Sequence, residues 1–320
     1  MTYSRKILTA GIVGAALPLG AGAAQADELS LSLATGGTGG VYFPLGGAMA
    51  EAWTQGVDGL TVTAESTGAS VVNARLIEDG ESDLAMIQND IVNYAVNAAE
   101  MFDGDDPMER NLGMAMLYPE LIQIVTLADS GIESVEDLAG TNVAVGAPGS
   151  GTEANARQIM EVHGISYDDI SEQFLPFGEA VDALRDGRID AAFLTAGIPT
   201  GSVVDLGSTE DISIVPIEAE NAEAIADAYP FYSPITIEGG TYSGIDEDVD
   251  TVTVLAMLTA SADLEADAVE QMLTVLFDEG TLETLCDTHA RGCDITLDTA
   301  TEAMPIDLHP GAEAFYDAHQ

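Results

Sequence analysis

Lysine is almost absent from this chain of 320 residues, and Lys6 is the only one. Arginine is also scarce, whereas 55 aspartate and glutamate residues bring the net charge to −47. Because nucleic-acid binding requires lysine and arginine to neutralise phosphates, this composition excludes a nucleic acid as partner. The acidic residues are spread along the whole chain rather than clustered. This favours a halophilic protein with an acidic surface over a local site for cations or basic ligands.

Long apolar runs are absent after the first 26 residues. Arg5 and Lys6 precede the apolar segment 7–24. The small residues at 24 and 26 stand at the −3 and −1 positions before a cleavage site. The pattern predicts a signal peptide over 1–26, cleaved after Ala26, which exports the mature chain 27–320 to the periplasm. A membrane anchor is the alternative, but the segment is rich in glycine and alanine and short for a bilayer span.

Cysteine is rare as well, with Cys286 and Cys293 close together near the C-terminus. In an oxidising compartment such a pair predicts a disulfide. The alternative is a zinc site that includes His289, but the sequence offers no two further ligands for it.

Strand-like and helix-like segments alternate along the mature chain. This alternation predicts an α/β fold with largely parallel sheets. The expected strands are 31–35, 60–67, 84–88, 122–128, 142–147, 172–177, 191–196, 212–217 and 251–258, and the expected helices are 41–53, 69–80, 134–140, 152–164 and 178–187.

One phrase occurs twice: "IEDGESDLAMI" (77–87) is echoed by "LRDGRIDAAFL" (184–194). In each copy a helix is expected to end at an Asp-Gly pair, and an acidic residue precedes a buried strand. The repeat predicts two similar α/β lobes rather than one large sheet.

Three strand-to-helix turns are rich in glycine, serine and threonine: "ATGGTGGVY", "ESTGASVVNA" and "VGAPGSGTEANA". Ligands of open α/β sheets bind at such turns, where helix N-termini present free N–H groups. The turns therefore predict a crevice for an anionic ligand that needs no cationic side chain. Glycine in "GGTGG" is expected to leave room for this ligand and to permit positive φ.

Catalytic motifs are missing from these turns. A phosphate-binding loop would need lysine where Thr152 stands, and a dinucleotide fingerprint would need glycine where Tyr42 stands. The four histidines lie outside the turns, and His163 is expected to end a helix. No spacing indicates a metal site. The sequence therefore favours a binding protein without cofactor or metal, whose lobes close around the ligand.

The segment "LATGGTGGVYFPLGGAMAEAW" (33–53) resembles the TAXI family of solute receptors, which serve tripartite ATP-independent periplasmic (TRAP) transporters. The similarity continues in order through 65–91, 117–161, 184–203 and 242–258. The resemblance implies a two-lobed periplasmic-binding-protein fold of the type II-like class, with the ligand in the interlobe cleft. The lobes would comprise 27–121 for the first, 122–252 for the second, and 253–320 for the return to the first with C-terminal helices.

The resemblance also implies a function. The protein, expected to be a monomer, would capture a small organic anion, namely a dicarboxylate or an acidic amino acid such as glutamate or 2-oxoglutarate. It would deliver this anion to the membrane subunits of a TRAP permease, fused or separate. Two alternatives remain open: a receptor on the same fold for another anion or small precursor, which serves an ATP-driven importer, and an exported serine hydrolase.

Ligand-binding residues are carried over from the resemblance by motif. Arg75 and Arg157 are the only arginines in the turn-and-helix segments, and their spacing past the helix starts favours contact with solvent or neighbouring acids. The implied ligand-binding set is Thr35, Gly39, Tyr42, Ser66, Thr67, Ser70, Asn73, Gln88, Asn89, Asp90, Ser150, Gly151, Thr152, Thr195 and Pro199.

Overall fold

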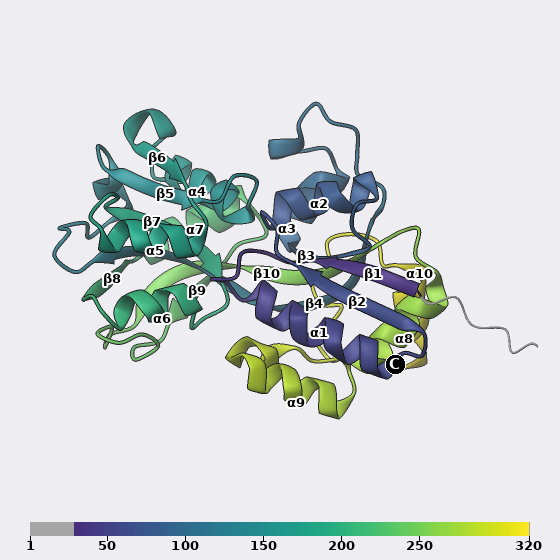
Figure 1. Cartoon of the computed structure of the whole chain (residues 1–320). Helices are drawn as coiled ribbons and strands as arrows, with labels where there is room; N and C mark the ends of the chain where they lie inside the picture. Colours follow the sequence, from purple (N-terminus) through teal and green to yellow (C-terminus); the bar gives the residue numbers. More distant parts are fainter. Residues whose placement is uncertain (1–28, 320) are drawn as a thin grey trace, which may run out of the picture.

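The computed structural model describes residues 29–319, which form two α/β lobes side by side (Figure 1). The predicted two-lobed α/β fold is confirmed. The predicted signal peptide lies outside the described residues. None of the helices within 29–319 is both long and apolar enough to span a membrane.

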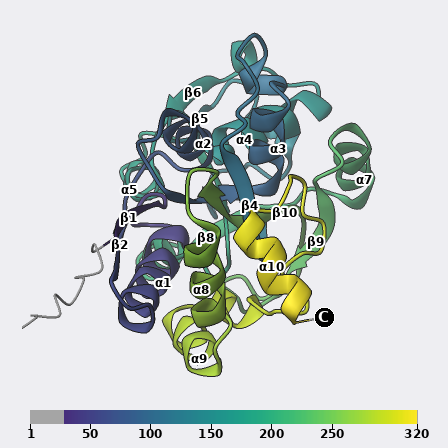
Figure 2. The ribbon, with the colours of Figure 1, turned by 90° about the vertical axis from the view of Figure 1, so that its right-hand side faces the viewer.

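Lobe 1 holds the N-terminal strands and the C-terminal helices (Figure 1). Figure 2 shows α8, α9 and α10 gathered at this end of the molecule, and α1 contacts α8 and α9. The elements of lobe 1 are β1 (Leu29–Ala34), α1 (Tyr42–Gly56), β2 (Leu60–Glu65), α2 (Ser70–Asp79), β3 (Leu84–Gln88), α3 (Asn89–Val96), the 3-10 helix η1 (Glu100–Phe102), α8 (Ala266–Leu276), α9 (Glu279–Thr288), η4 (Ala290–Asp294) and α10 (Pro310–Ala318).

Lobe 2 is built from the middle of the chain. The predicted helix at 134–140 is wrong in type, because this segment forms only the short 3-10 helix η2. The elements of lobe 2 are η2 (Val135–Leu138), β5 (Asn142–Gly146), α4 (Gly151–Val162), η3 (Tyr167–Asp169), β6 (Ser171–Phe174), α5 (Phe177–Arg185), β7 (Ala191–Ala196), α6 (Gly201–Gly207), β8 (Ile212–Val215), α7 (Ala219–Ala228) and β9 (Ser233–Ile237).

Two long strands, β4 (Asn111–Leu127) and β10 (Val249–Ser261), run from one lobe to the other. The expectation of two lobes rather than one large sheet is wrong in its second part, because one 10-stranded sheet runs through both lobes. Its order is β2-β1-β3-β10-β4-β7-β5-β6, with β8 beside β4 and β9 beside β10. The expected lobe boundaries, after 121 and after 252, fall inside these two strands and stay a prediction. The sheet is mixed rather than largely parallel, because β4 and β10 pair antiparallel with their neighbours.

The repeated phrase corresponds to equivalent positions in the two lobes. Gly80 and Gly187 adopt positive φ where α2 and α5 end. The carboxylate of Asp83 accepts a hydrogen bond from Ser32 N at 2.8 Å, and that of Asp190 accepts one from Asn142 N at 2.8 Å. Each acid therefore ties the start of its strand to the neighbouring parallel strand, which explains why the phrase recurs.

Apolar clusters fill both lobes and fix the helices on the sheet. In α1 the side chains of Tyr42, Leu45, Met49 and Trp53 recur at helical spacing and are buried. Trp53 also donates a hydrogen bond from Nε1 to Met272 O at 2.9 Å, which links α1 to α8. Because α1 is packed in this way, its N-terminus and the glycine turn before it are held where the two lobes meet.

A disulfide joins Cys286 and Cys293 between α9 and η4. His289 lies between them, but its Nε2 bonds to Pro199 O at 3.0 Å and its Nδ1 accepts from Arg291 N. Within residues 29–319 no group of histidine, cysteine and acidic side chains is arranged to hold a metal. His163 is the C-cap residue of α4, as predicted.

Candidate functional site

A cleft of about 680 Å³ lies where the two lobes meet. Lobe 1 contributes the turns before α1 and α2 and the end of β3, and lobe 2 contributes the turns before α4 and α5 and the end of β7. All three glycine-rich turns identified in the sequence reach this cleft. The predicted residues that line it are Gly39, Tyr42, Ser66, Thr67, Ser70, Gln88, Ser150, Gly151, Thr152 and Thr195.

Five predicted residues do not line the cleft: Thr35, Asn73, Asn89, Asp90 and Pro199. Asn73 donates from Nδ2 to Thr35 O at 2.6 Å and to Met86 O at 2.8 Å, so it supports the turns from behind. Asn89 accepts at Oδ1 from a backbone N–H of β10. These side chains position the cleft wall instead of forming its surface.

The hydroxyl groups predicted as ligand donors bond mainly within the turns themselves. Ser66 Oγ donates to Gly36 O at 2.9 Å, and Thr67 Oγ1 lies within hydrogen-bond distance of Thr35 O and of Asn73 Oδ1. Ser150 Oγ donates to Ala147 O at 2.8 Å. Within the described chain, the hydroxyl groups of Ser70 and Thr152 only accept hydrogen bonds, from Gln88 N and Thr195 N, so they keep a donor alongside the backbone N–H groups of the turns.

Four helices begin at the cleft: α1 at Tyr42, α2 at Ser70, α4 at Gly151 and α5 at Phe177. The first N–H groups of a helix have no partner within the helix, and its N-terminus carries a partial positive charge. Helix N-termini that meet at one cavity form an anion site made of backbone alone.

The "GGTGG" turn meets the opposite lobe. A Cβ added at Gly39 would lie 3.3 Å from Gly178 N and 3.5 Å from the Cβ atoms of Phe177 and Ser202, all in lobe 2. Ser202 N also donates to Gly39 O at 3.3 Å. A Cβ added at Gly37 meets nothing within 4 Å, so Gly37 leaves open space at the cleft.

The expectation that this turn needs positive φ is wrong. None of the glycines from 36 to 40 adopts positive φ, whereas Gly146 and Gly149 in the turn before α4 do. In the "GGTGG" turn, glycine is required for the close approach of the two lobes and for free space at the cleft.

Glu120, on β4, lines the cleft and was not among the predicted residues. Its side chain is buried, and Oε2 accepts a hydrogen bond from the Tyr42 hydroxyl at 2.7 Å. Burial raises the pKa of Glu120 to about 8, although the Tyr42 hydrogen bond opposes this rise. Burial, followed by the charge of Glu120, raises the pKa of Tyr42 well above its usual value. Glu120 is the one acid in the mostly apolar sequence of β4, and this feature could have identified it from the sequence.

Tyr42→Phe is expected to lower the free energy of unfolding by about 1–2 kcal/mol, because Glu120 Oε2 then loses its donor while buried. Urea unfolding at high salt measures this loss. Tyr118→Phe is the matched control, since the buried Tyr118 hydroxyl has no hydrogen-bond partner among residues 29–319. Equal losses in the two variants would contradict a specific role for the Tyr42–Glu120 bond.

A buried polar network joins the lobes behind the cleft. Asn155 on α4 donates from Nδ2 to Asp90 Oδ2 at 3.0 Å and lies 2.6 Å from the Tyr232 hydroxyl. Gln88 donates to Asn155 Oδ1 at 3.1 Å, and Tyr232 donates to Gln158 Oε1 at 2.7 Å. Burial raises the pKa of Asp90 to about 6. The network fixes α3 of lobe 1 against α4 of lobe 2.

Asp90→Asn is expected to stabilise the protein at neutral pH. The folded-state pKa of Asp90 lies above its usual value of 3.8, so its contribution to stability is complete below about pH 4 and is lost as the pH rises through 6. The asparagine variant lacks this loss. The free energy of unfolding of Asp90→Asn should exceed that of wild type by on the order of 1–3 kcal/mol at pH 7.5 but not at pH 4.

Urea unfolding across this pH range provides the measurement, with the exposed Asp168→Asn as control. A stability difference between wild type and Asp90→Asn that does not change with pH would contradict the assignment.

Cationic side chains do not line the cleft among the described residues. Arg75 forms an ion pair with Asp105 at 2.7 Å, and Arg157 lies 3.6 Å from Glu153, so both contact neighbouring acids as predicted. Anion binding in this cleft would therefore depend on the helix N-termini.

Solved structures share this fold at low sequence identity. PhnD1 from Prochlorococcus marinus, in complex with methylphosphonate, aligns with a TM-score of 0.55 at 9% identity over 82% of this chain and 90% of that one. A protein from Bordetella bronchiseptica aligns with a TM-score of 0.54 at 18% identity over 89% and 81%. A periplasmic transporter aligns with a TM-score of 0.52 at 13% identity over 81% and 87%.

These similarities establish the fold as that of two-lobed periplasmic substrate-binding proteins. The pattern of the NMT1-like family matches residues 33–318, which is nearly the whole of the described chain. The chain therefore belongs to the NMT1-like family.

Proposed function

We propose that this protein is an exported solute receptor, not an enzyme, which captures a small organic anion and delivers it to a TRAP-type secondary transporter. The ligand class is a dicarboxylate or an acidic amino acid, such as 2-oxoglutarate or glutamate. The observation that carries the proposal is the meeting of four helix N-termini at a cleft between two lobes. Such a site binds carboxylates through backbone N–H groups without arginine or lysine.

The two lobes are joined in a way that suits capture and release. The chain passes between them along β4 and β10. Other interlobe contacts include hydrogen bonds that can separate when the lobes rotate, such as Gly39 with Ser202, His289 with Pro199, and the network of Gln88 and Asp90 with Asn155. Rotation about two crossing strands would open the cleft without unfolding either lobe. PhnD1, which shares the fold, was solved with the small anion methylphosphonate, and this supports an anionic solute here as well.

The choice of a TRAP partner depends on the sequence resemblance to the TAXI family, which extends from 33–53 through 242–258. The membership in the NMT1-like family over 33–318 is consistent with it. Export to the periplasm follows from the predicted signal peptide.

Transport into proteoliposomes tests the proposal. Vesicles that contain a TRAP permease from the same genome are mixed with the purified receptor and radiolabelled L-glutamate or 2-oxoglutarate at high salt. We expect uptake that requires the receptor and an inward sodium gradient and proceeds without ATP. Absence of uptake with the TRAP permease, together with ATP-dependent uptake in vesicles that contain an ATP-driven importer from the same genome, would instead assign the receptor to that importer. Failure of the receptor to bind any small acid would contradict the proposal altogether.

A further inference from the structure

The cleft presents carboxyl groups to its ligand as well as helix N-termini. Three carboxylates line it, those of Glu120, Glu179 and Asp182, and no lysine, arginine or histidine lines it within residues 29–319. Glu179 and Asp182 are exposed on α5, where water screens them, and Asp182 pairs with Arg185 at 2.6 Å. Glu120 is different, because it is buried in the wall of the cleft.

The two carboxylate oxygens of Glu120 have different surroundings. Oε2 accepts the hydrogen bond from Tyr42, whereas Oε1 has no hydrogen bond within the described chain. Oε1 is nevertheless not fully buried, since it keeps accessible surface. Glu120 is also one of the residues that line the cleft. A carboxyl oxygen of Glu120 without a partner therefore faces the cleft, and it becomes opposite in charge to the helix N-termini of the same space when Glu120 is ionised.

We infer that Glu120 binds the ammonium group of an α-amino acid whose carboxylate is held at the helix N-termini. The inference rests on the proposed function and narrows its ligand class from organic anions to amino acids. An ammonium donates to Oε1 in a charge-assisted hydrogen bond, and this bond is strong where water is excluded. A 2-oxo acid has a carbonyl oxygen at the same position, which can accept a hydrogen bond from protonated Glu120 but cannot form the stronger bond between two charged groups.

Among residues 29–319, no cationic side chain competes for Glu120. Tyr42 on α1 and Tyr118 on β4 are neutral buried phenols, and Asp90 on α3 adds to the rise of the Glu120 pKa. On β10, Thr253 and Val254 pair with the Glu120 backbone and do not titrate. With its pKa near 8, Glu120 is largely protonated in the empty cleft at neutral pH. Binding of an ammonium would ionise it, so a proton would be released.

Matched ligand pairs give the first test. Isothermal titration calorimetry at high salt and pH 7.5 compares L-glutamate with 2-oxoglutarate and L-alanine with pyruvate. We expect at least one amino acid to bind, and to bind at least about 10-fold more tightly than its oxo acid, because a hydrogen bond between charged groups is made only by the amino acid. Titration in buffers of different ionisation enthalpy should also show proton release.

Glu120→Gln is the matched variant, since its amide keeps the shape and an acceptor for Tyr42 but loses the charge. It should weaken amino-acid binding by about 10- to 100-fold and leave binding of the oxo acid within about 2-fold. Glu283→Gln, an exposed change on α9 far from the cleft, is the control. Melting temperatures establish that both variants are folded.

The outcomes separate the inference from the proposed function. An oxo acid that binds as tightly as its amino acid, or a Glu120→Gln variant with unchanged affinity for the amino acid, overturns the inference alone. Absence of binding for every amino acid and every oxo acid overturns the proposed function and the inference together.

Discussion

Gly39→Val is expected to abolish solute binding and to leave the melting temperature within a few degrees of wild type. A Cβ at this position already meets Gly178 N at 3.3 Å, and the branched side chain of valine would press further into Phe177 and Ser202 of lobe 2. The clash is relieved when the lobes separate, so neither core is disturbed. The separated lobes cannot contact one ligand together, and we expect the affinity to fall by at least about 100-fold.

Calorimetric binding and thermal unfolding of the same preparation measure this effect. Gly47→Val is the control, because a Cβ at Gly47 meets nothing within 4 Å and Gly47 does not line the cleft. A Gly39→Val protein that binds like wild type would mean that lobe contact through this turn is unnecessary. One that unfolds would mean that the turn is needed for the fold.

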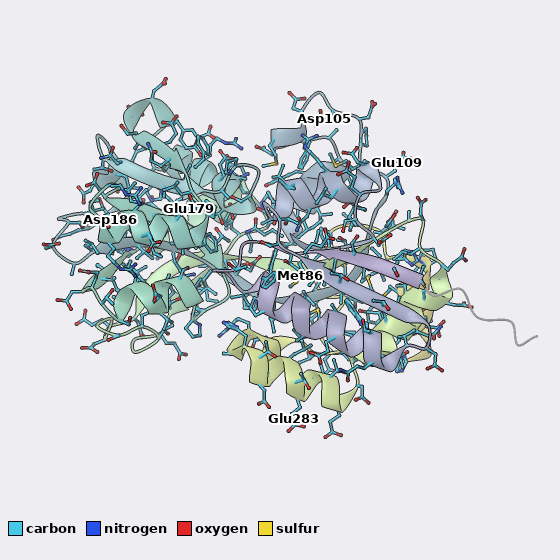
Figure 3. The ribbon with its side chains drawn as sticks, viewed as in Figure 1. Met86, Asp105, Glu109, Glu179, Asp186 and Glu283 are labelled. Atoms are coloured by element: carbon cyan, nitrogen blue, oxygen red, sulfur yellow. A yellow bond between two sulfur atoms is a disulfide. The ribbon has the colours of Figure 1, made fainter. Side chains whose placement is uncertain are left out.

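Salt is expected to raise the melting temperature by many degrees between about 0.1 and 2 M NaCl, as the Debye length falls from ~10 Å to below 3 Å. The net charge of −47 makes mutual repulsion of carboxylates the main electrostatic cost of folding. Figure 3 shows the side chains of Asp105, Glu109, Asp186 and Glu283 projecting outward from different parts of the surface. Screening by salt weakens this repulsion over the whole molecule.

The same salt series at pH about 4 is the control, because many carboxylates are then protonated and the repulsion is smaller. The salt effect should shrink markedly at the lower pH. A melting temperature that is flat or falls with salt at neutral pH would contradict the account. An equal rise at both pH values would assign the effect to the exclusion of salt from the surface.

The parts of the cleft that depend on local sequence could be predicted. A glycine-rich turn between a strand and a helix is specified by adjacent residues, and so are helix ends such as Gly80 and Gly187. The strand-end positions of these turns then placed Ser150, Thr152 and their neighbours at the cleft. Parallel strands bring such turns to one edge, so sequence order was enough.

The parts that depend on contacts between distant segments could not be predicted. Glu120 stands out as the one acid in β4, but its contact with Tyr42 depends on how β4 packs against the start of α1. Their separation of 78 residues leaves no local signal for that contact. The same holds for the contact of Gly39 with Ser202. Thr35, Asn73 and Asn89 were predicted as ligand contacts, but their side chains bond to the backbone of adjacent strands and turns. A polar residue at a strand end can either contact the ligand or bond to the neighbouring backbone. Only the packing of the folded chain decides between these two roles.

A crystal structure of the protein grown with L-glutamate at high salt tests the central claim most directly. The account predicts one ordered glutamate in the interlobe cleft, with its ammonium against Glu120 Oε1 and a carboxylate at the helix N-termini. A glutamate bound outside this cleft, or an empty cleft in a protein that binds glutamate in solution, would contradict it.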